Sequence, residues 1–187
     1  SADSFFQTNT SQAEKLYAIA REYAEFRGDE ILFDLYCGTG STSVFMADGV
    51  KKVYGFELFS SAVEDAVRNA VNNNVSNCRF YEANLDKFFR VTPILNEIEK
   101  PHVVLLDPPR AGMNPKLVRD VVGMKPDKIV YISCNPSTQA RDVALMIKEG
   151  YKLEKLSMVD MFPHTPHIET VALLKGGYKH DKNHVSV

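Results

Sequence analysis

The chain has 187 residues, of which 44% are hydrophobic, and its formal net charge is −2. This length fits one domain of ordinary size with a single core, and the near-neutral charge gives no sign of a surface built to bind a polyanion. Three cysteines without paired spacing exclude a disulfide framework and a cysteine-rich metal site. No apolar stretch approaches the roughly 20 residues that cross a bilayer and no secretion signal is visible, so we expect a soluble, cytoplasmic protein.

Hydrophobic residues recur at helical spacing over 11–26, and Gly28 follows as a stop. Beyond it, short apolar runs alternate with helix-like segments. Because these runs are continuously hydrophobic, we expect strands buried on both faces, and hence a parallel sheet with helices on each side. The expected strands lie near 30–35, 52–57, 78–82, 102–107 and 128–133. The expected helices lie near 41–48, 59–73, 85–98, 114–123 and 136–149.

Two further strands, near 151–159 and 168–175, have only a loop between them and should form a hairpin. The last strand therefore runs antiparallel to the others. The βαβ rhythm predicts a doubly wound, Rossmann-like α/β fold with a mostly parallel seven-stranded sheet. We expect a single domain over 1–176, with 1–28 as a helical lead-in, and a polar, flexible tail over 177–187.

Polar side chains gather where the expected strands end. The carboxyl ends of four parallel strands carry Asp34, Glu57, Asp107 and Cys134. An antiparallel last strand begins on the same edge, which brings residues 167–169, with His167 and Glu169, to these side chains. In open α/β sheets, ligands bind beyond the carboxyl ends of the parallel strands. The sequence therefore predicts a site at this edge.

A glycine-containing turn follows the first strand at residues 34–40 (DLYCGTG). Gly38 and Gly40 allow a tight turn and a close approach by a ligand. Glu57, at the end of the second strand, can accept hydrogen bonds from the ribose hydroxyls of an adenosine. Together they predict a nucleoside cofactor, without distinguishing NAD from S-adenosylmethionine.

Cys134 stands between a strongly β-forming run, 128–133, and a helix start. Asn135 can cap that helix and Pro136 suits its first position. The partial positive charge of a helix N-terminus favours a thiolate, which makes Cys134 a candidate nucleophile. The alternative is a small apolar residue that fills the core.

Residues 107–110 (DPPR) form a turn that two prolines make rigid. The turn fixes the Asp107 carboxylate and the Arg110 guanidinium at the mouth of the site, an arrangement that favours a methyltransferase over a dehydrogenase. Amino-group methyltransferases usually have an aromatic residue at the fourth position. Because Arg110 stands there, the target atom need not be an exocyclic amine. A purely structural turn is the alternative.

Further motifs accompany these: residues 5–9 (FFQTN), 133–136 (SCNP), 140–142 (ARD) and 161–169 (MFPHTPHIE). With them, the chain resembles the catalytic domain of the bacterial-type RNA uracil-5-methyltransferases, which make 5-methyluridine in tRNA or 23S rRNA. The resemblance runs from Ser4 to Lys175. It implies S-adenosylmethionine as cofactor, S-adenosylhomocysteine as product, and no metal or iron–sulfur cluster in this chain. It places the cofactor contacts on Gln7, Tyr36, Gly38, Gly40, Ser41, Glu57, Asn84 and Asp107.

The resemblance also implies the chemistry. Cys134 would add to carbon 6 of uracil, and Glu169 would remove the carbon-5 proton. Asp107 and Arg110 would orient the uracil edge and stabilise charge on its oxygen. The RNA substrate would present an unpaired or flipped-out uridine. The family's N-terminal RNA-binding domains are absent from this sequence, which we expect to be monomeric and not membrane-bound.

Two other functions remain open: methylation of a different atom or of a small molecule, and a non-catalytic RNA-associated factor that keeps the cofactor pocket. Among the remaining residues, Cys37 and Cys78 are expected to pack in the core. Tyr17 is expected in the buried stripe of the first helix. Arg141 either contacts a phosphate or pairs with a nearby acid.

Overall fold

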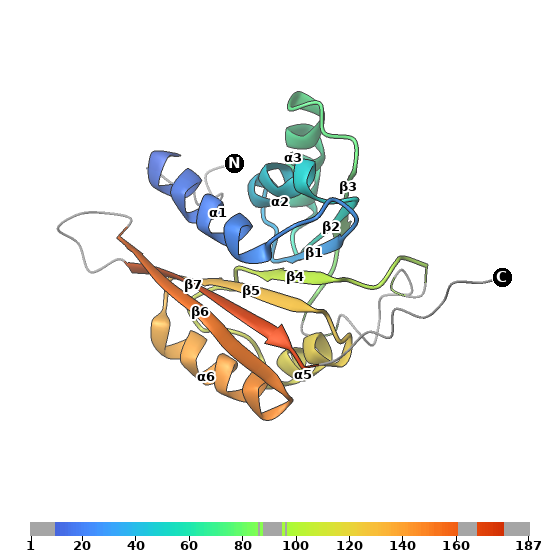
Figure 1. Cartoon of the computed structure of the whole chain (residues 1–187). Helices are drawn as coiled ribbons and strands as arrows, with labels where there is room; N and C mark the ends of the chain where they lie inside the picture. Colours follow the sequence, from blue (N-terminus) through green and yellow to red (C-terminus); the bar gives the residue numbers. More distant parts are fainter. Residues whose placement is uncertain (1–9, 86, 88–94, 96, 161–167, 178–187) are drawn as a thin grey trace.

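The structure, a computed structural model, describes residues 10–85, 87, 95, 97–160 and 168–177. These residues form one sheet with helices on both faces (Figure 1). The strands are β1 (Ile31–Leu35), β2 (Lys52–Glu57), β3 (Cys78–Glu82), β4 (Val103–Leu106), β5 (Lys128–Ser133), β6 (Tyr151–Asp160) and β7 (Ile168–Gly176). The helices are α1 (Thr10–Ala24), α2 (Ser41–Met46), α3 (Ser60–Asn72), α5 (Pro115–Gly123) and α6 (Pro136–Lys148), with the short 3₁₀ turn η1 (Ala47–Gly49).

The seven strands lie in the order β3-β2-β1-β4-β5-β7-β6. Strands β1 to β5 pair in parallel, whereas β7 runs antiparallel to both β5 and β6. The predicted mostly parallel sheet with an antiparallel last strand is confirmed. The predicted strand limits agree with the observed ones to within one residue at each end.

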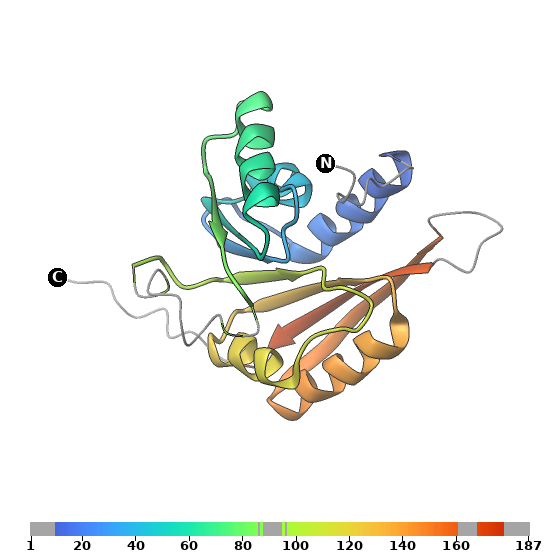
Figure 2. The ribbon, with the colours of Figure 1, turned by 180° about the vertical axis from the view of Figure 1, so that it is seen from behind.

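Helices α1, α2 and α3 cover one face of the sheet, and α5 and α6 cover the other (Figures 1 and 2). The central strand β1 is buried at every position, because side chains alternate between the two faces. Leu32 packs in the core beneath α1 and α2, while Phe33 packs in the core beneath α5 and α6. Burial of each such side chain contributes about 1.5–3 kcal/mol. This double burial explains the continuous hydrophobic runs in the sequence.

The end of α1 differs from the prediction. The helix stops at Ala24 rather than near residue 26, because Glu25 takes a left-handed conformation with φ of 50°. The Lys128 ammonium donates to the Ala24 carbonyl at 2.6 Å and so satisfies one of the last helix carbonyls. Glu25 forms ion pairs with lysines from three strands: Lys128, Lys155 and Lys175. Tertiary contacts therefore set this helix end, and Gly28 lies beyond it.

Two expectations fall largely outside the described residues: the helix near 85–98 and the tail over 177–187. Both remain predictions. Within the described part of the chain, none of the helices combines the length and hydrophobicity that crossing a membrane requires.

Candidate active site

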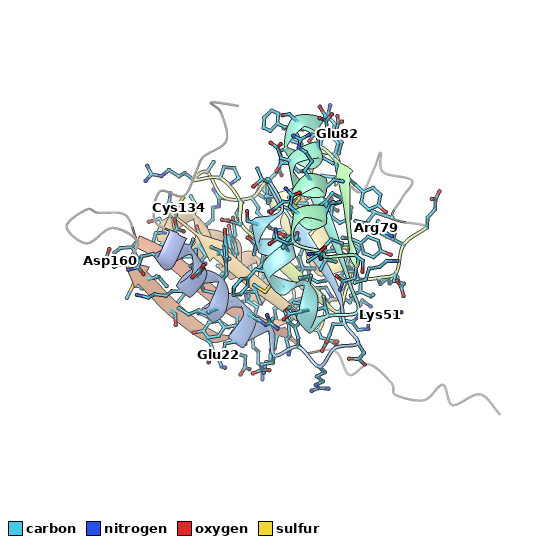
Figure 3. The ribbon with its side chains drawn as sticks, turned by 90° about the horizontal axis from the view of Figure 1, so that it is seen from above. Glu22, Lys51, Arg79, Glu82, Cys134 and Asp160 are labelled. Atoms are coloured by element: carbon cyan, nitrogen blue, oxygen red, sulfur yellow. The ribbon has the colours of Figure 1, made fainter. Side chains whose placement is uncertain are left out.

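The carboxyl ends of the parallel strands meet along one edge of the sheet. Figure 3 shows Glu82, the last residue of β3, and Cys134, directly after β5, toward this edge, and Lys51, which precedes β2, toward the other. Because β7 is antiparallel to β5, it begins at the same edge, with Thr170 paired to Ser133. Cys134 and Glu169 are the next residues along these two neighbouring strands. The topology therefore brings the two together, as the sequence predicts.

The glycine turn after β1 uses a left-handed backbone conformation, which is strained for residues with a side chain. Gly38 and Gly40 both have positive φ, of 53° and 75°. A Cβ on Gly40 would lie 2.8 Å from the Ala66 Cβ, so this glycine lets α3 pack closely. A Cβ on Gly38 would have no atom within 4 Å, which leaves open space beside the turn. Gly40 thus serves packing, and Gly38 leaves room for a ligand.

Glu57 fastens this turn to the end of β2. Its Oε2 accepts a hydrogen bond from the Gly38 amide at 3.1 Å. Its Oε1 accepts from the Leu58 amide at 2.7 Å and from the Phe59 amide at 3.2 Å. An ionised carboxylate offers about four acceptor positions, so one remains for a ligand hydroxyl. The carboxylate stands beside the open space at Gly38, where the sequence places a ribose.

Three carboxylates of this region, Asp34, Asp107 and Glu169, are here called the acidic edge. Burial raises the pKa of Asp34 to about 7, and the charge of Glu57 adds to the rise. Burial also raises the pKa of Asp107 to about 7, with further contributions from the charges of Glu169 and Asp34. The pKa of Glu169 rises to about 6 through burial, although the Arg110 guanidinium opposes this. Such a site favours a bound proton or a cationic ligand.

Ser43 supports a charge on the buried Asp34 through hydrogen bonds from its hydroxyl and from its backbone. The Ser43 hydroxyl donates to Asp34 Oδ2 at 2.5 Å, and both side chains are buried. Ser43 stands where a dinucleotide-binding turn would have its third glycine, and its hydroxyl explains why a serine fits here. Among the described residues, no group of three or more His, Cys, Asp or Glu side chains is arranged to hold a metal ion.

Cys134 lies in a turn whose hydrogen bonds match the predicted helix start. The Asn135 side chain accepts from the Ser137 amide at 3.1 Å and caps α6, and Pro136 is its first residue. The Ser133 hydroxyl accepts from the Asn135 amide at 3.0 Å.

Cys134 is half-buried, whereas the other two cysteines are buried. Burial raises the pKa of the Cys78 thiol to about 12 and that of Cys37 well above its usual range. The prediction that these two pack in the core is confirmed.

The turn after β4 is hydrogen-bonded to the turn that follows β5. Within the turn, the Gly112 amide donates to the Pro109 carbonyl at 2.8 Å. The Arg110 carbonyl accepts from Asn135 Nδ2 at 3.0 Å and from Thr138 Oγ1 at 3.1 Å. The backbone of Arg110 is thus bonded to the residues that follow Cys134.

Arg141 pairs with an acid, which confirms one of its two predicted roles. Its Nε and Nη2 donate to Asp142 Oδ1 at 2.9 and 2.8 Å. Asp142 is fully buried, and its Oδ2 accepts from the Met113 amide and the Tyr131 hydroxyl, both at 2.8 Å. Arg141 Nη2 also donates to the carbonyls of Ala111 and Met113. This network supports the turn that carries Arg110. The motif at 140–142 was visible in the sequence, but its partners were not.

Tyr17 lies closer to the site than expected. It is half-buried, and its ring lies 5.7 Å from that of Phe45. Burial raises the pKa of Tyr17, and the nearby charges of Asp107, Asp34 and Glu169 raise it further. Tyr17 therefore lies near enough to the acidic edge to feel its charges.

The remaining predicted residues are placed as follows. Ser41 is the exposed first residue of α2, and Asn84 is exposed after β3. Tyr36 is half-buried with φ of 67°, and its amide donates to the Phe56 carbonyl. Gln7 and His167 lie outside the described residues. A cavity of about 380 Å³ lies away from this site: its lining residues include Pro101, Gly123 and Met124, near the opposite ends of the strands.

Solved structures with this arrangement define a class. The N-methyltransferase NodS from Bradyrhizobium japonicum WM9, in complex with S-adenosyl-L-homocysteine, aligns with a TM-score of 0.75 over 94% of this chain and 93% of that chain. At 10% identity this likeness shows the fold alone. The fold is the Rossmann-like fold of S-adenosylmethionine-dependent methyltransferases.

The chain belongs to the tRNA (uracil-5-)-methyltransferase family, whose model matches residues 1–176. An uncharacterized RNA methyltransferase of Caldanaerobacter subterraneus subsp. tengcongensis is 45% identical over 162 residues, which cover 87% of this chain and 35% of that protein. The tRNA (uracil-54, C5)-methyltransferase of Pyrococcus abyssi, solved with S-adenosyl-L-homocysteine, has a TM-score of 0.77 at 40% identity and covers 92% of this chain and 40% of that one. The chain thus spans little more than a third of these relatives.

Proposed function

We propose that this chain transfers a methyl group from S-adenosylmethionine to carbon 5 of a uridine in RNA, through a covalent adduct between Cys134 and carbon 6. One observation carries the proposal: in a member of this family, the half-buried Cys134 directly follows Ser133 of β5, and Glu169 directly precedes Thr170, the residue of β7 that pairs with Ser133. A tRNA is the first substrate to test, since the relative from Pyrococcus abyssi is a tRNA enzyme.

The residues around the glycine turn fit the cofactor. Gly38 leaves open space, and Glu57 stands beside it with one acceptor position left for a ribose hydroxyl. The acidic edge suits the positive charges of a sulfonium and an ammonium group. When bound, S-adenosylmethionine supplies an electrophilic methyl group. We assign the cofactor contacts to Gln7, Tyr36, Gly38, Gly40, Ser41, Glu57, Asn84 and Asp107.

The chain's own residues would perform the remaining steps. The Cys134 thiolate adds to carbon 6, which breaks the carbon 5–carbon 6 double bond and makes carbon 5 nucleophilic enough to take the methyl group. Arg110 and Asp107 hold the polar edge of the ring and stabilise the charge on its oxygen. Glu169 then takes the proton of carbon 5. The electron pair of that C–H bond restores the double bond, and the sulfur leaves carbon 6 as thiolate.

Glu169 suits the base role because of its surroundings. Its raised pKa of about 6 leaves it largely ionised at pH 7 and more basic than an ordinary glutamate. A general base is most effective when its pKa lies near the working pH.

The test uses RNA that contains 5-fluorouridine, whose carbon 5 keeps fluorine in place of the proton, so the adduct cannot resolve after methyl transfer. With S-adenosylmethionine present, we expect a stable protein–RNA complex on a denaturing gel. Cys134→Ala should form none, while calorimetry shows unchanged affinity for S-adenosylhomocysteine. An adduct in Cys134→Ala, or a methyl group found on nitrogen or oxygen, would refute the mechanism.

Glu169→Gln tests the steps that follow methyl transfer, in which the carbon-5 proton and the Cys134 thiolate leave. With ordinary uridine RNA, this variant should accumulate the covalent complex and release methylated RNA slowly, because the amide cannot take the proton. Normal turnover by Glu169→Gln would remove Glu169 as the base without affecting the role of Cys134.

A further inference from the structure

Two loops that carry the proposed chemistry are hydrogen-bonded to each other. The turn after β4 presents Arg110, and the turn after β5 presents Cys134. Asn135 Nδ2 and Thr138 Oγ1 both donate to the Arg110 carbonyl, at 3.0 and 3.1 Å. Both donors come from the residues directly after Cys134, where α6 begins.

The Arg110 turn depends on donors from outside. Pro108 and Pro109 have no amide N–H, so neither residue can donate a backbone hydrogen bond within the turn. Within the turn, the Gly112 amide donates to the Pro109 carbonyl. Arg141 and Asp142 fix residues 111–113, beyond Arg110. The Arg110 carbonyl itself accepts hydrogen bonds from Asn135 and Thr138.

The two donors are not explained by helix capping alone. The cap of α6 uses Asn135 Oδ1, which accepts from the Ser137 amide, and leaves Nδ2 for Arg110. Thr138 Oγ1 also lies 3.1 Å from the Asn135 carbonyl, a local bond that a threonine in a first turn commonly makes. That local bond does not require the hydroxyl to lie within hydrogen-bond distance of the Arg110 carbonyl as well.

We propose that Asn135 and Thr138 are positioning residues, which hold the Arg110 turn at a fixed place relative to Cys134 so that both act on the same uracil ring. The inference rests on the proposed function. Attack at carbon 6 requires the sulfur and the ring to meet in a narrow geometry, and a displacement of about 1 Å can reduce a rate about a hundredfold. Arg110 holds the edge of the ring while Cys134 attacks its face, so the link between the loops sets that geometry.

The test measures the rate of adduct formation with 5-fluorouridine RNA in two variants. Thr138→Val removes the hydroxyl at nearly constant shape. Asn135→Ser keeps an oxygen that caps the helix and removes the amide donor. We expect each to slow adduct formation about tenfold, which is the loss of one hydrogen bond, with unchanged affinity for S-adenosylhomocysteine and a similar thermal midpoint. Thr138→Ser should restore the rate, and Ser137→Ala, an exposed neighbour, should keep it.

The double variant distinguishes a shared function from two separate ones. Because both donors hold one carbonyl, Asn135→Ser with Thr138→Val should lose less than the product of the two single effects. If the wild type forms the adduct and each single variant forms it as fast as the wild type, the inference is wrong and the proposed function stands. Equal losses of adduct rate and of cofactor affinity would also overturn it, in favour of a structural role. A wild type that forms no adduct refutes the proposed function, and this inference with it.

Discussion

Replacing the buried Asp34 by asparagine should change how the stability of the protein depends on pH. The pKa of this carboxyl lies at about 7 in the folded protein, against a usual value of 3.8. Between these two values the folded state holds a proton that the unfolded state has released. The free energy of unfolding therefore falls as the pH rises through this window. The amide side chain of the variant would carry no charge at any pH.

The magnitude follows from the window. One pKa unit corresponds to about 1.36 kcal/mol. Between pH 5 and pH 8, where a group with a pKa of about 7 gives up its proton, Asp34 therefore lowers the free energy of unfolding of the wild type by about 3 kcal/mol. In Asp34→Asn, the free energy of unfolding does not fall for this reason. Its gain in stability over the wild type should be about 3 kcal/mol larger at pH 8 than at pH 5. Any constant difference in how the amide packs against Ser43 cancels in this comparison.

The assay is urea unfolding of both proteins at pH 5 and at pH 8. Asp29→Asn is the matched control, because it makes the same change at an exposed aspartate. Parallel profiles for the wild type and Asp34→Asn would refute the reasoning, since they would mean that Asp34 ionises in the folded protein as it does in the unfolded chain.

Three other results are expected. The acidic edge holds about one proton at pH 7, since two of its members have a pKa of about 7. Binding of S-adenosylmethionine should release this proton. Equal apparent binding enthalpies, measured by calorimetry in two buffers of different ionisation enthalpy, would contradict this. Iodoacetamide should label Cys134 first in the native protein, because Cys37 and Cys78 are buried; mass spectrometry that finds either buried cysteine modified first would contradict the burial. Gly112→Ala should lower the free energy of unfolding by about 3 kcal/mol, because left-handed strain adds to displacement of the Arg141–Asp142 pair. Gly38→Ala, with no atom within 4 Å of the added Cβ, should cost only the strain of about 1 kcal/mol in urea unfolding; equal losses would contradict the steric argument.

The sequence predicted the features that depend on neighbouring residues. Asn135 and Pro136 indicated the start of α6, and the structure confirms the cap and the first helical position. Strands buried on both faces predicted the parallel sheet, and the parallel sheet in turn placed Cys134 at the carboxyl edge of the strands. These inferences need only local chemistry and the rule that sites form beyond the carboxyl ends of strands.

Features that depend on distant partners were missed or left open. The end of α1 depends on lysines from three strands, which no local pattern around Glu25 indicates. The role of Arg141 stayed undecided because its partners include carbonyls about 30 residues away. Tyr17 was assigned to a helix stripe, since helical periodicity does not tell which end of a stripe opens onto a site. In each case the missing information was a tertiary contact.

The acidic edge lowers stability at neutral pH at a position where packing does not require a charge. Asp34 is flanked in β1 by buried apolar residues and has one hydrogen-bond partner, Ser43. A charge that costs folding free energy is retained more readily when it serves a ligand. Asp34→Asn should therefore be more stable than the wild type at pH 8 and bind S-adenosylmethionine more weakly, by at least tenfold in calorimetry. If stability rises while affinity stays the same, the charge of Asp34 does not serve the cofactor, and the attraction of the site for a cation must come from Asp107 and Glu169.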